Sequence, residues 1–132
     1  MGCNTPIESE KIKIVTSFFV MEDFARKIGG EYTDVQSIIP SGGEIHGYEP
    51  TTGDIVALED ADLFIYNGAG LEHFIDGLKQ ALDGSDVQFV DTSSGLTFIE
   101  EESHQDSHTW LNPLNAKKQM ENIKNTLVLR DQ

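Results

Sequence analysis

The chain has 132 residues, a formal net charge of -14 and a single cysteine. This length fits one domain with one core, and the negative charge argues against a nucleic-acid partner, because phosphate binding needs a basic surface. One cysteine allows no internal disulfide. The chain contains no run of about eighteen apolar residues, so the sequence predicts no membrane span.

The first part of the chain shows strand and helix patterns in turn. Residues 11–17 alternate and then become apolar, which predicts a strand. Gly29-Gly30 predicts the end of the helix that follows, and the apolar residues at helical spacing in that helix are Val20, Met21, Phe24 and Ile28. The β-branched residues within 35–39 predict a second strand.

A glycine-rich loop, residues 40–50, comes next and contains His46. Thr51 or Thr52 can cap the helix after it, with Ile55 and Leu58 facing inward. This arrangement predicts a strand, a loop and a helix in succession, and such loops carry function at the carboxyl ends of strands in open α/β sheets.

Two further strands are predicted in the central part of the chain. Residues 63–66 form a continuous apolar run, which is typical of a strand buried on both faces of a parallel sheet. Residues 87–90 predict the fourth strand. Between them, a helix carries His73 on its solvated face, and its apolar stripe consists of Leu71, Phe74, Ile75, Leu78 and Leu82.

The last predicted helix begins at Asn112-Pro113, with asparagine as the cap and proline in the first turn. Its predicted inner face consists of Ala116, Met120, Ile123 and Leu127. The preceding residues, 98–107, are acidic, lack periodicity and predict a loop that contains His104. Trp110 is expected to anchor the segment around His108 by burial.

This alternation predicts an α/β fold, a single lobe with a mostly parallel four-stranded sheet flanked by helices on both faces. Parallel sheets place ligands at the carboxyl ends of their strands. His46 follows the second strand and His108 follows the fourth, so the two imidazoles can converge on one edge of the sheet.

Imidazole and carboxylate groups at this edge suit zinc, manganese or a similar divalent ion. The candidates are His46, His108, Glu44, Glu49, His104 and Asp106. Each histidine alone is also compatible with an ordinary surface histidine. The chain has no His-Glu-x-x-His helix and no Cys-x-x-Cys pair, so the sequence favours metal binding over catalysis.

Cys3 allows three interpretations: a chance free thiol, part of a myristoylation signal, or a lipoprotein processing site. Pro6 stands where the myristoylation pattern requires serine or threonine. In the third interpretation, residues 1–10 form a short polar tether with a lipid-modified cysteine.

Four segments together carry a resemblance to one protein family: residues 39–50, 60–68, 70–74 and 108–113. From Lys11 to its end, the chain is similar to the N-terminal lobe of the zinc and manganese solute-binding lipoproteins that serve ABC importers. Residues 66–68 and 71–73 together are more similar to the zinc branch. Ser107 departs from the family's usual proline, which puts the local loop geometry in question.

The resemblance implies that His46 and His108 are metal ligands, with zinc as the ion and manganese as the alternative. Glu44, Glu49 and His104 are candidates for auxiliary contacts. The resemblance also implies that residues 11–132 are an N-terminal metal-binding lobe. The remaining ligands would come from a C-terminal lobe, which we expect to be absent here.

The resemblance further implies an extracytoplasmic cell-surface lipoprotein that is held at the bacterial membrane through Cys3. It would deliver the ion to an ABC importer permease without acting as an enzyme. An uncovered lobe face would favour self-association. Two alternatives remain: a metal-dependent hydrolase, which requires a third ligand and a bound water, and a surface adhesion module, which predicts partner binding that survives metal chelation.

Overall fold

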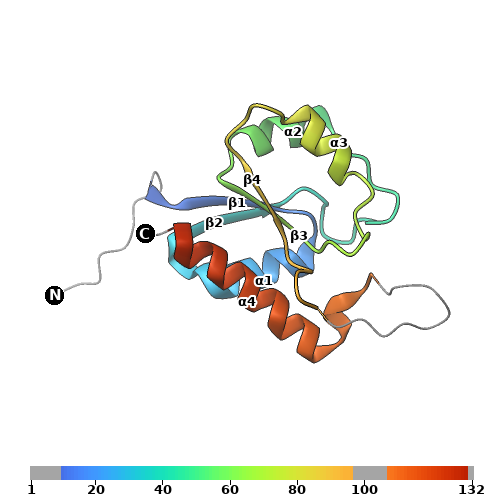
Figure 1. Cartoon of the computed structure of the whole chain (residues 1–132). Helices are drawn as coiled ribbons and strands as arrows, with labels where there is room; N and C mark the ends of the chain where they lie inside the picture. The colour runs from blue at the N-terminus through green and yellow to red at the C-terminus, as the bar shows by residue number, and fades with distance from the viewer. Residues whose placement is uncertain (1–9, 97–106, 131–132) are drawn as a thin grey trace.

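Four parallel strands form the centre of the fold in the computed structural model, which describes residues 10–96 and 107–130. The strand order is β2-β1-β3-β4 and every neighbouring pair is parallel (Figure 1). The strands are β1 (Ile12–Thr16), β2 (Thr33–Ser37), β3 (Leu63–Tyr66) and β4 (Gln88–Asp91). The predicted fold class is therefore confirmed, whereas Cys3 and His104 lie outside the described residues.

The helices cover both faces of the sheet, with α1 and α4 on one face and α2 and α3 on the other (Figure 1). Two short 3-10 helices, η2 and η3, precede β2 and α4. Within the described ranges, no helix has the length and apolar character needed to cross a membrane. The helix bounds are α1 (Phe19–Gly29), η2 (Gly30–Tyr32), α2 (Thr52–Glu59), α3 (Ile75–Ala81), η3 (Thr109–Leu111) and α4 (Pro113–Arg130).

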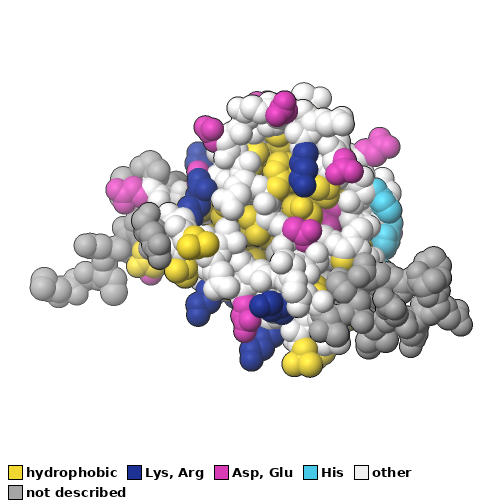
Figure 2. All heavy atoms as spheres, in the orientation of Figure 1, with side chains coloured by type: hydrophobic (Ala, Val, Ile, Leu, Met, Phe, Trp, Pro, Cys, Tyr) yellow, Lys and Arg dark blue, Asp and Glu magenta, His cyan; other side chains and the backbone are white. Residues whose placement is uncertain are grey.

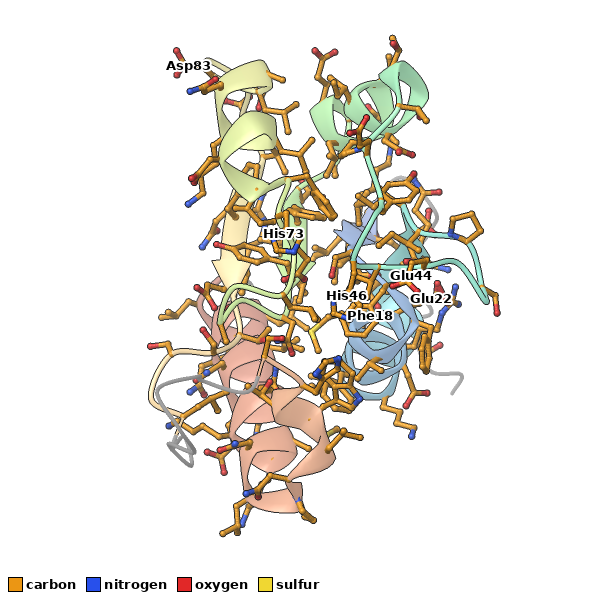
Figure 3. All side chains as sticks on the ribbon, turned by 90° about the vertical axis from the view of Figure 1, so that its right-hand side faces the viewer. Phe18, Glu22, Glu44, His46, His73 and Asp83 are labelled. Carbon is orange, nitrogen blue, oxygen red and sulfur yellow. The ribbon has the colours of Figure 1, made fainter. Side chains whose placement is uncertain are left out.

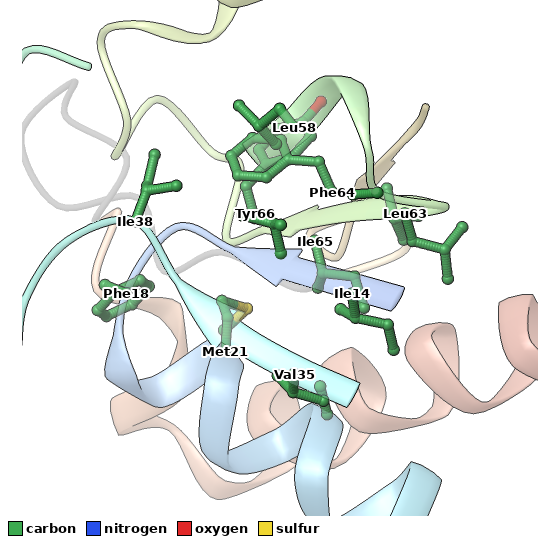
Figure 4. Packing of buried hydrophobic residues seen from close by; sticks show 14 of the residues in the cluster. Ile14, Phe18, Met21, Val35, Ile38, Leu58, Leu63, Phe64, Ile65 and Tyr66 are labelled. Carbon is green, nitrogen blue, oxygen red and sulfur yellow. The ribbon is translucent and has the colours of Figure 1, made fainter. Parts of the chain in front are cut away.

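The core follows from the two-residue period of the strands. On β3, Phe64 and Tyr66 point toward Leu58 of α2, while Ile65 points toward Met21 of α1 (Figure 4). All four β3 side chains are buried, as the continuous apolar run predicted. The sheet thus packs against helices on both faces, and its ends remain free to carry loops.

Helix ends were largely predictable from capping residues. The Thr51 hydroxyl accepts the Asp54 N–H at 3.1 Å, and the Asp54 carboxylate accepts the Thr51 N–H at 2.9 Å, which completes a capping box. Asn112 caps α4 by accepting the Leu114 N–H at 2.9 Å. Gly30, with a φ of 53°, follows the end of α1 as predicted.

Strand β2 differs from its predicted range of 35–39, since it begins at Thr33 and ends at Ser37. The pairing with β1 nevertheless continues beyond it, because Ile38 N–H donates to Thr16 O at 2.9 Å and Ile39 N–H to Ser17 O at 3.2 Å. The apolar residues 38–39 are buried at the start of the loop, where the chain leaves the sheet.

The prediction that a helix begins near Leu71 is wrong, because α3 begins only at Ile75. The Glu72 carboxylate turns back and accepts the N–H groups of Asn67 and Gly68. These bonds hold residues 67–72 in a turn, with positive φ angles at Gly68, Ala69 and Gly70. His73 is exposed as expected, but it precedes α3 instead of lying on a helix face.

The predicted inner face of α4 is also partly wrong. Ile123 and Leu127 are buried, but Ala116 and Met120 are only half-buried. The polar residues Asn115 and Gln119 occupy the buried positions instead. Inside the fold, Gln119 Nε2 donates to Asn67 Oδ1 and to Thr92 Oγ1, so the inner face of α4 is not set by apolar residues alone.

Candidate metal site

The structure brings His46 and His108 together at the carboxyl edge of the sheet. Their ring centroids are 5.4 Å apart and their planes meet at 63°. One histidine follows β2 and the other precedes η3, so the convergence arises from strand order, as the sequence predicted. Figure 3 looks onto this edge and labels His46 and Glu44, and Figure 2 shows histidine side chains exposed along it.

The His46 loop is held at both ends. A Cβ atom at Gly43 would lie 2.9 Å from both Ile39 Cγ2 and Pro40 O, so the tight turn leaves no space for a side chain there. Glu44 Oε1 accepts the backbone N–H of His46 at 2.9 Å. The predicted auxiliary residue Glu44 therefore shapes the loop that presents His46, whose own side chain is exposed.

Tyr48 fastens the far end of this loop to α2 through a short hydrogen bond from its hydroxyl to Asp54. Burial, followed by the hydrogen bond and the charge of Asp54, raises the pKa of Tyr48 to about 12. Tyr48 therefore remains a neutral phenol at physiological pH. It acts as a hydrogen-bond donor within the loop and supplies no anionic oxygen for a metal ion.

The His108 segment is anchored by aromatic packing. Trp110 makes an edge contact with Phe18, with centroids 5.0 Å apart, and its ring centroid lies 5.4 Å from that of His108. Trp110 is half-buried against the core. This packing fits the expectation that the tryptophan restricts the position of His108.

A buried polar network lies beneath the same segment, and sequence reasoning did not identify it. Its members lie just after β3 and β4, in η3 and in α4, and all are at most 3% exposed. Gln119 Nε2 donates to Asn67 Oδ1 and to Thr92 Oγ1, each at 2.8 Å. Two of its members, Asn67 and Thr109, fall inside the family-like segments 60–68 and 108–113, and that was the available signal. The network consists of Asn67, Thr92, Thr109 and Gln119.

No other candidate within residues 10–96 and 107–130 joins the histidine pair to form a group of three metal-binding side chains. Glu49 and His73 are exposed. Among the described residues, no group of three or more His, Cys, Asp or Glu side chains has the geometry to hold a metal ion. The described part of the chain therefore offers a two-imidazole pair.

Glu72 is a buried carboxylate near the same edge, only 5% exposed. It accepts the Ser17 hydroxyl at 2.6 Å and the N–H groups of Asn67 and Gly68 at 2.7 and 3.0 Å. Burial raises the pKa of Glu72, although these hydrogen bonds act in the opposite direction. Its oxygens are occupied by donors of the chain, so its role is to connect the loops after β1 and β3.

Comparison with known proteins supports the resemblance. A family model described as the periplasmic component A of a zinc-uptake complex matches residues 14–132. The manganese-binding lipoprotein MntA of Halalkalibacterium halodurans is 39% identical over 127 residues, which cover 96% of this chain and 42% of that protein. The high-affinity zinc uptake system protein ZnuA of Bacillus subtilis is 33% identical over 139 residues, covering 94% and 44%.

The fold is shared with a solved relative. The crystal structure of the Zn(II)-bound ZnuA-like domain of Streptococcus pneumoniae AdcA has a TM-score of 0.80 and 30% identity, covering 89% of this chain and 43% of that chain. The chain thus spans less than half the length of the relatives it matches.

Proposed function

Because the chain belongs to the family of periplasmic zinc-uptake component A proteins, we propose that residues 11–132 form a metal-binding lobe whose ligands are His46 and His108. The ion is zinc, with manganese as the alternative, and it is passed to an ABC importer. The observation that carries this proposal is the approach of the two imidazoles from separate loops, with ring centroids 5.4 Å apart.

The separation of the two rings suits a shared ion. A zinc ion bonded to one nitrogen of each ring at about 2.1 Å would lie about 3.2 Å from each centroid, and a tetrahedral angle would separate the centroids by about 5.2 Å. The observed 5.4 Å agrees with this value.

The donor set favours zinc over manganese. Neutral imidazole is a common zinc ligand, whereas manganese prefers carboxylate, carbonyl and water oxygens. A relative is named for each metal, so the preference rests on ligand chemistry and not on the names. Two coordination positions of a tetrahedral ion remain for water or for groups outside the described residues.

Binding and delivery fit the site better than hydrolysis. A catalytic zinc site normally combines three protein ligands with an open position and a nearby base. The described residues supply two imidazoles and no third ligand. An importer permease as partner and an extracytoplasmic location are supported by the relatives' names, which describe uptake systems and lipoproteins.

Zinc titration by calorimetry tests the proposal. We expect the parent chain to bind one zinc ion, His46→Ala and His108→Ala each to weaken binding, and the double variant to show no binding at that stoichiometry. His73→Ala is the matched control, because His73 is an exposed histidine outside the pair. Equal binding by the parent and the double variant would refute the assignment.

A further inference from the structure

We infer that Asn67 is a positioning residue for His108, and this inference rests on the proposed metal-binding function. Asn67 follows β3 and is completely buried. It lies 41 positions before His108 in the sequence, so the link between the two is created by the fold alone.

The Asn67 side chain forms hydrogen bonds with both neighbours of His108. Its Nδ2 donates to the Ser107 carbonyl at 2.9 Å, and its Oδ1 lies 3.0 Å from the Thr109 hydroxyl, which can donate to it. The backbone of His108 is therefore fixed on both sides by one amide group. Such bonds restrict where the His108 backbone places the imidazole, although Asn67 itself is not a metal ligand.

The amide itself is held in a single orientation. Asn67 Nδ2 also donates to Gly68 O at 3.0 Å, and Oδ1 also accepts from Gln119 Nε2 at 2.8 Å. An amide offers two donors and two acceptor lone pairs, so all four positions are occupied. Rotating the amide by 180° would place donors against donors, because Gln119 Nε2 would then face an NH₂ group.

The two histidines therefore differ in how firmly the fold holds them in position. His46 is exposed on a loop, and Glu44, which accepts its backbone N–H, belongs to that same loop. His108 is half-buried, its neighbours in the chain are bonded to Asn67, and its ring lies against Trp110. We expect His108 to be the preorganised ligand and His46 to adjust to it.

The test compares zinc affinity and the His108 imidazole signal by NMR in Asn67→Ala and in the control Ile123→Ala. Ile123 is fully buried on α4, belongs to the hydrophobic core and is not a member of the polar network, so its variant measures the effect of lost stability. We expect Asn67→Ala to lose about tenfold to a hundredfold in affinity, the range for partners that orient metal ligands. We also expect the His108 signal to shift or broaden while that of His46 stays in place.

If Asn67→Ala does not fold, a second pair of variants tests the same positioning role. Thr109→Val removes the hydroxyl that approaches Asn67 Oδ1, and Thr109→Ser keeps it. We expect Thr109→Ser to bind zinc more tightly than Thr109→Val at equal folded fraction. Equal affinities in this pair would overturn the inference.

The outcomes separate this inference from the proposed function. If Asn67→Ala binds zinc as tightly as the parent, or loses no more affinity than Ile123→Ala, the positioning role is refuted while the ligand assignment stands. If the parent binds no zinc, or the His46 and His108 double variant binds it equally well, the proposed function fails and this inference fails with it.

Discussion

Replacing Glu72 by glutamine changes one atom of a buried side chain and removes its charge. In the parent, Oε2 accepts the Ser17 hydroxyl and the Asn67 N–H, and Oε1 accepts the Gly68 N–H. A glutamine has one oxygen, so its NH₂ group must face at least one of these donors.

The expected cost follows from that mismatch. If the amide oxygen takes the Oε2 position and keeps two bonds, the Gly68 N–H is left without an acceptor in a buried turn. A buried unsatisfied donor costs about 1–3 kcal/mol. We therefore expect Glu72→Gln to lower the free energy of unfolding by about that amount at acidic pH, where the parent carboxyl is neutral.

The pH dependence gives the sharper test. Burial raises the pKa of Glu72 in the folded chain, so the folded state binds more protons than the unfolded state above the usual glutamate pKa of about 4.3. The contribution of Glu72 to parent stability is therefore fully present below that value and is lost as the pH rises through the folded pKa. Glutamine does not titrate, so the difference in the free energy of unfolding between parent and variant becomes smaller as the pH rises.

Urea unfolding, followed by the fluorescence of the single tryptophan, measures this difference from about pH 4 to about pH 8. Glu49→Gln is the matched control, because Glu49 is exposed and its replacement should leave stability nearly unchanged. A difference that widens with pH would show that the fold stabilises the Glu72 carboxylate and would refute the reasoning. A constant difference would show that Glu72 titrates alike in both states.

Three further predictions concern stability and binding. Thr51→Ala removes the hydroxyl that accepts the Asp54 N–H and should lower the free energy of unfolding in urea by about 0.5–2 kcal/mol. An unchanged free energy would show that the capping box does not stabilise the fold. Leu58→Ala opens a cavity at a fully buried position and should cost about 2–5 kcal/mol, a smaller value indicating that the core collapses around it. Zinc affinity should be weaker in acidic solution than at neutral pH, because metal binding to imidazole releases protons, and a pH-independent affinity in calorimetry would argue against histidine ligands.

Local signals explain why much of the fold was predictable. The buried strand at residues 63–66 and the caps at Thr51 and Asn112 each depend on neighbouring residues in the sequence. The convergence of His46 and His108 followed from placing two loops at one edge of a parallel sheet. These features require only periodicity, capping chemistry and topology.

The errors arose where distant polar groups override local pattern. The apolar spacing from Leu71 predicted a helix, but the Glu72 carboxylate accepts hydrogen bonds from Ser17 on the loop after β1 and from the start of its own turn. On α4, the amide of Gln119 is buried because three partners from other elements meet it there. The bonds from Glu72 to Ser17 and from Gln119 to Asn67 join residues more than 50 positions apart, so hydrophobic periodicity within one segment does not predict them.

The bonds of Glu72 also determine where a ligand can sit on this sheet. In the order β2-β1-β3-β4, the chain changes direction between β1 and β3, and open α/β folds commonly bind ligands in the crevice at that reversal. Here the donors of that crevice, Ser17, Asn67 and Gly68, already bind the Glu72 carboxylate. The Glu72 side chain thus fills the place where related architectures receive an anionic ligand.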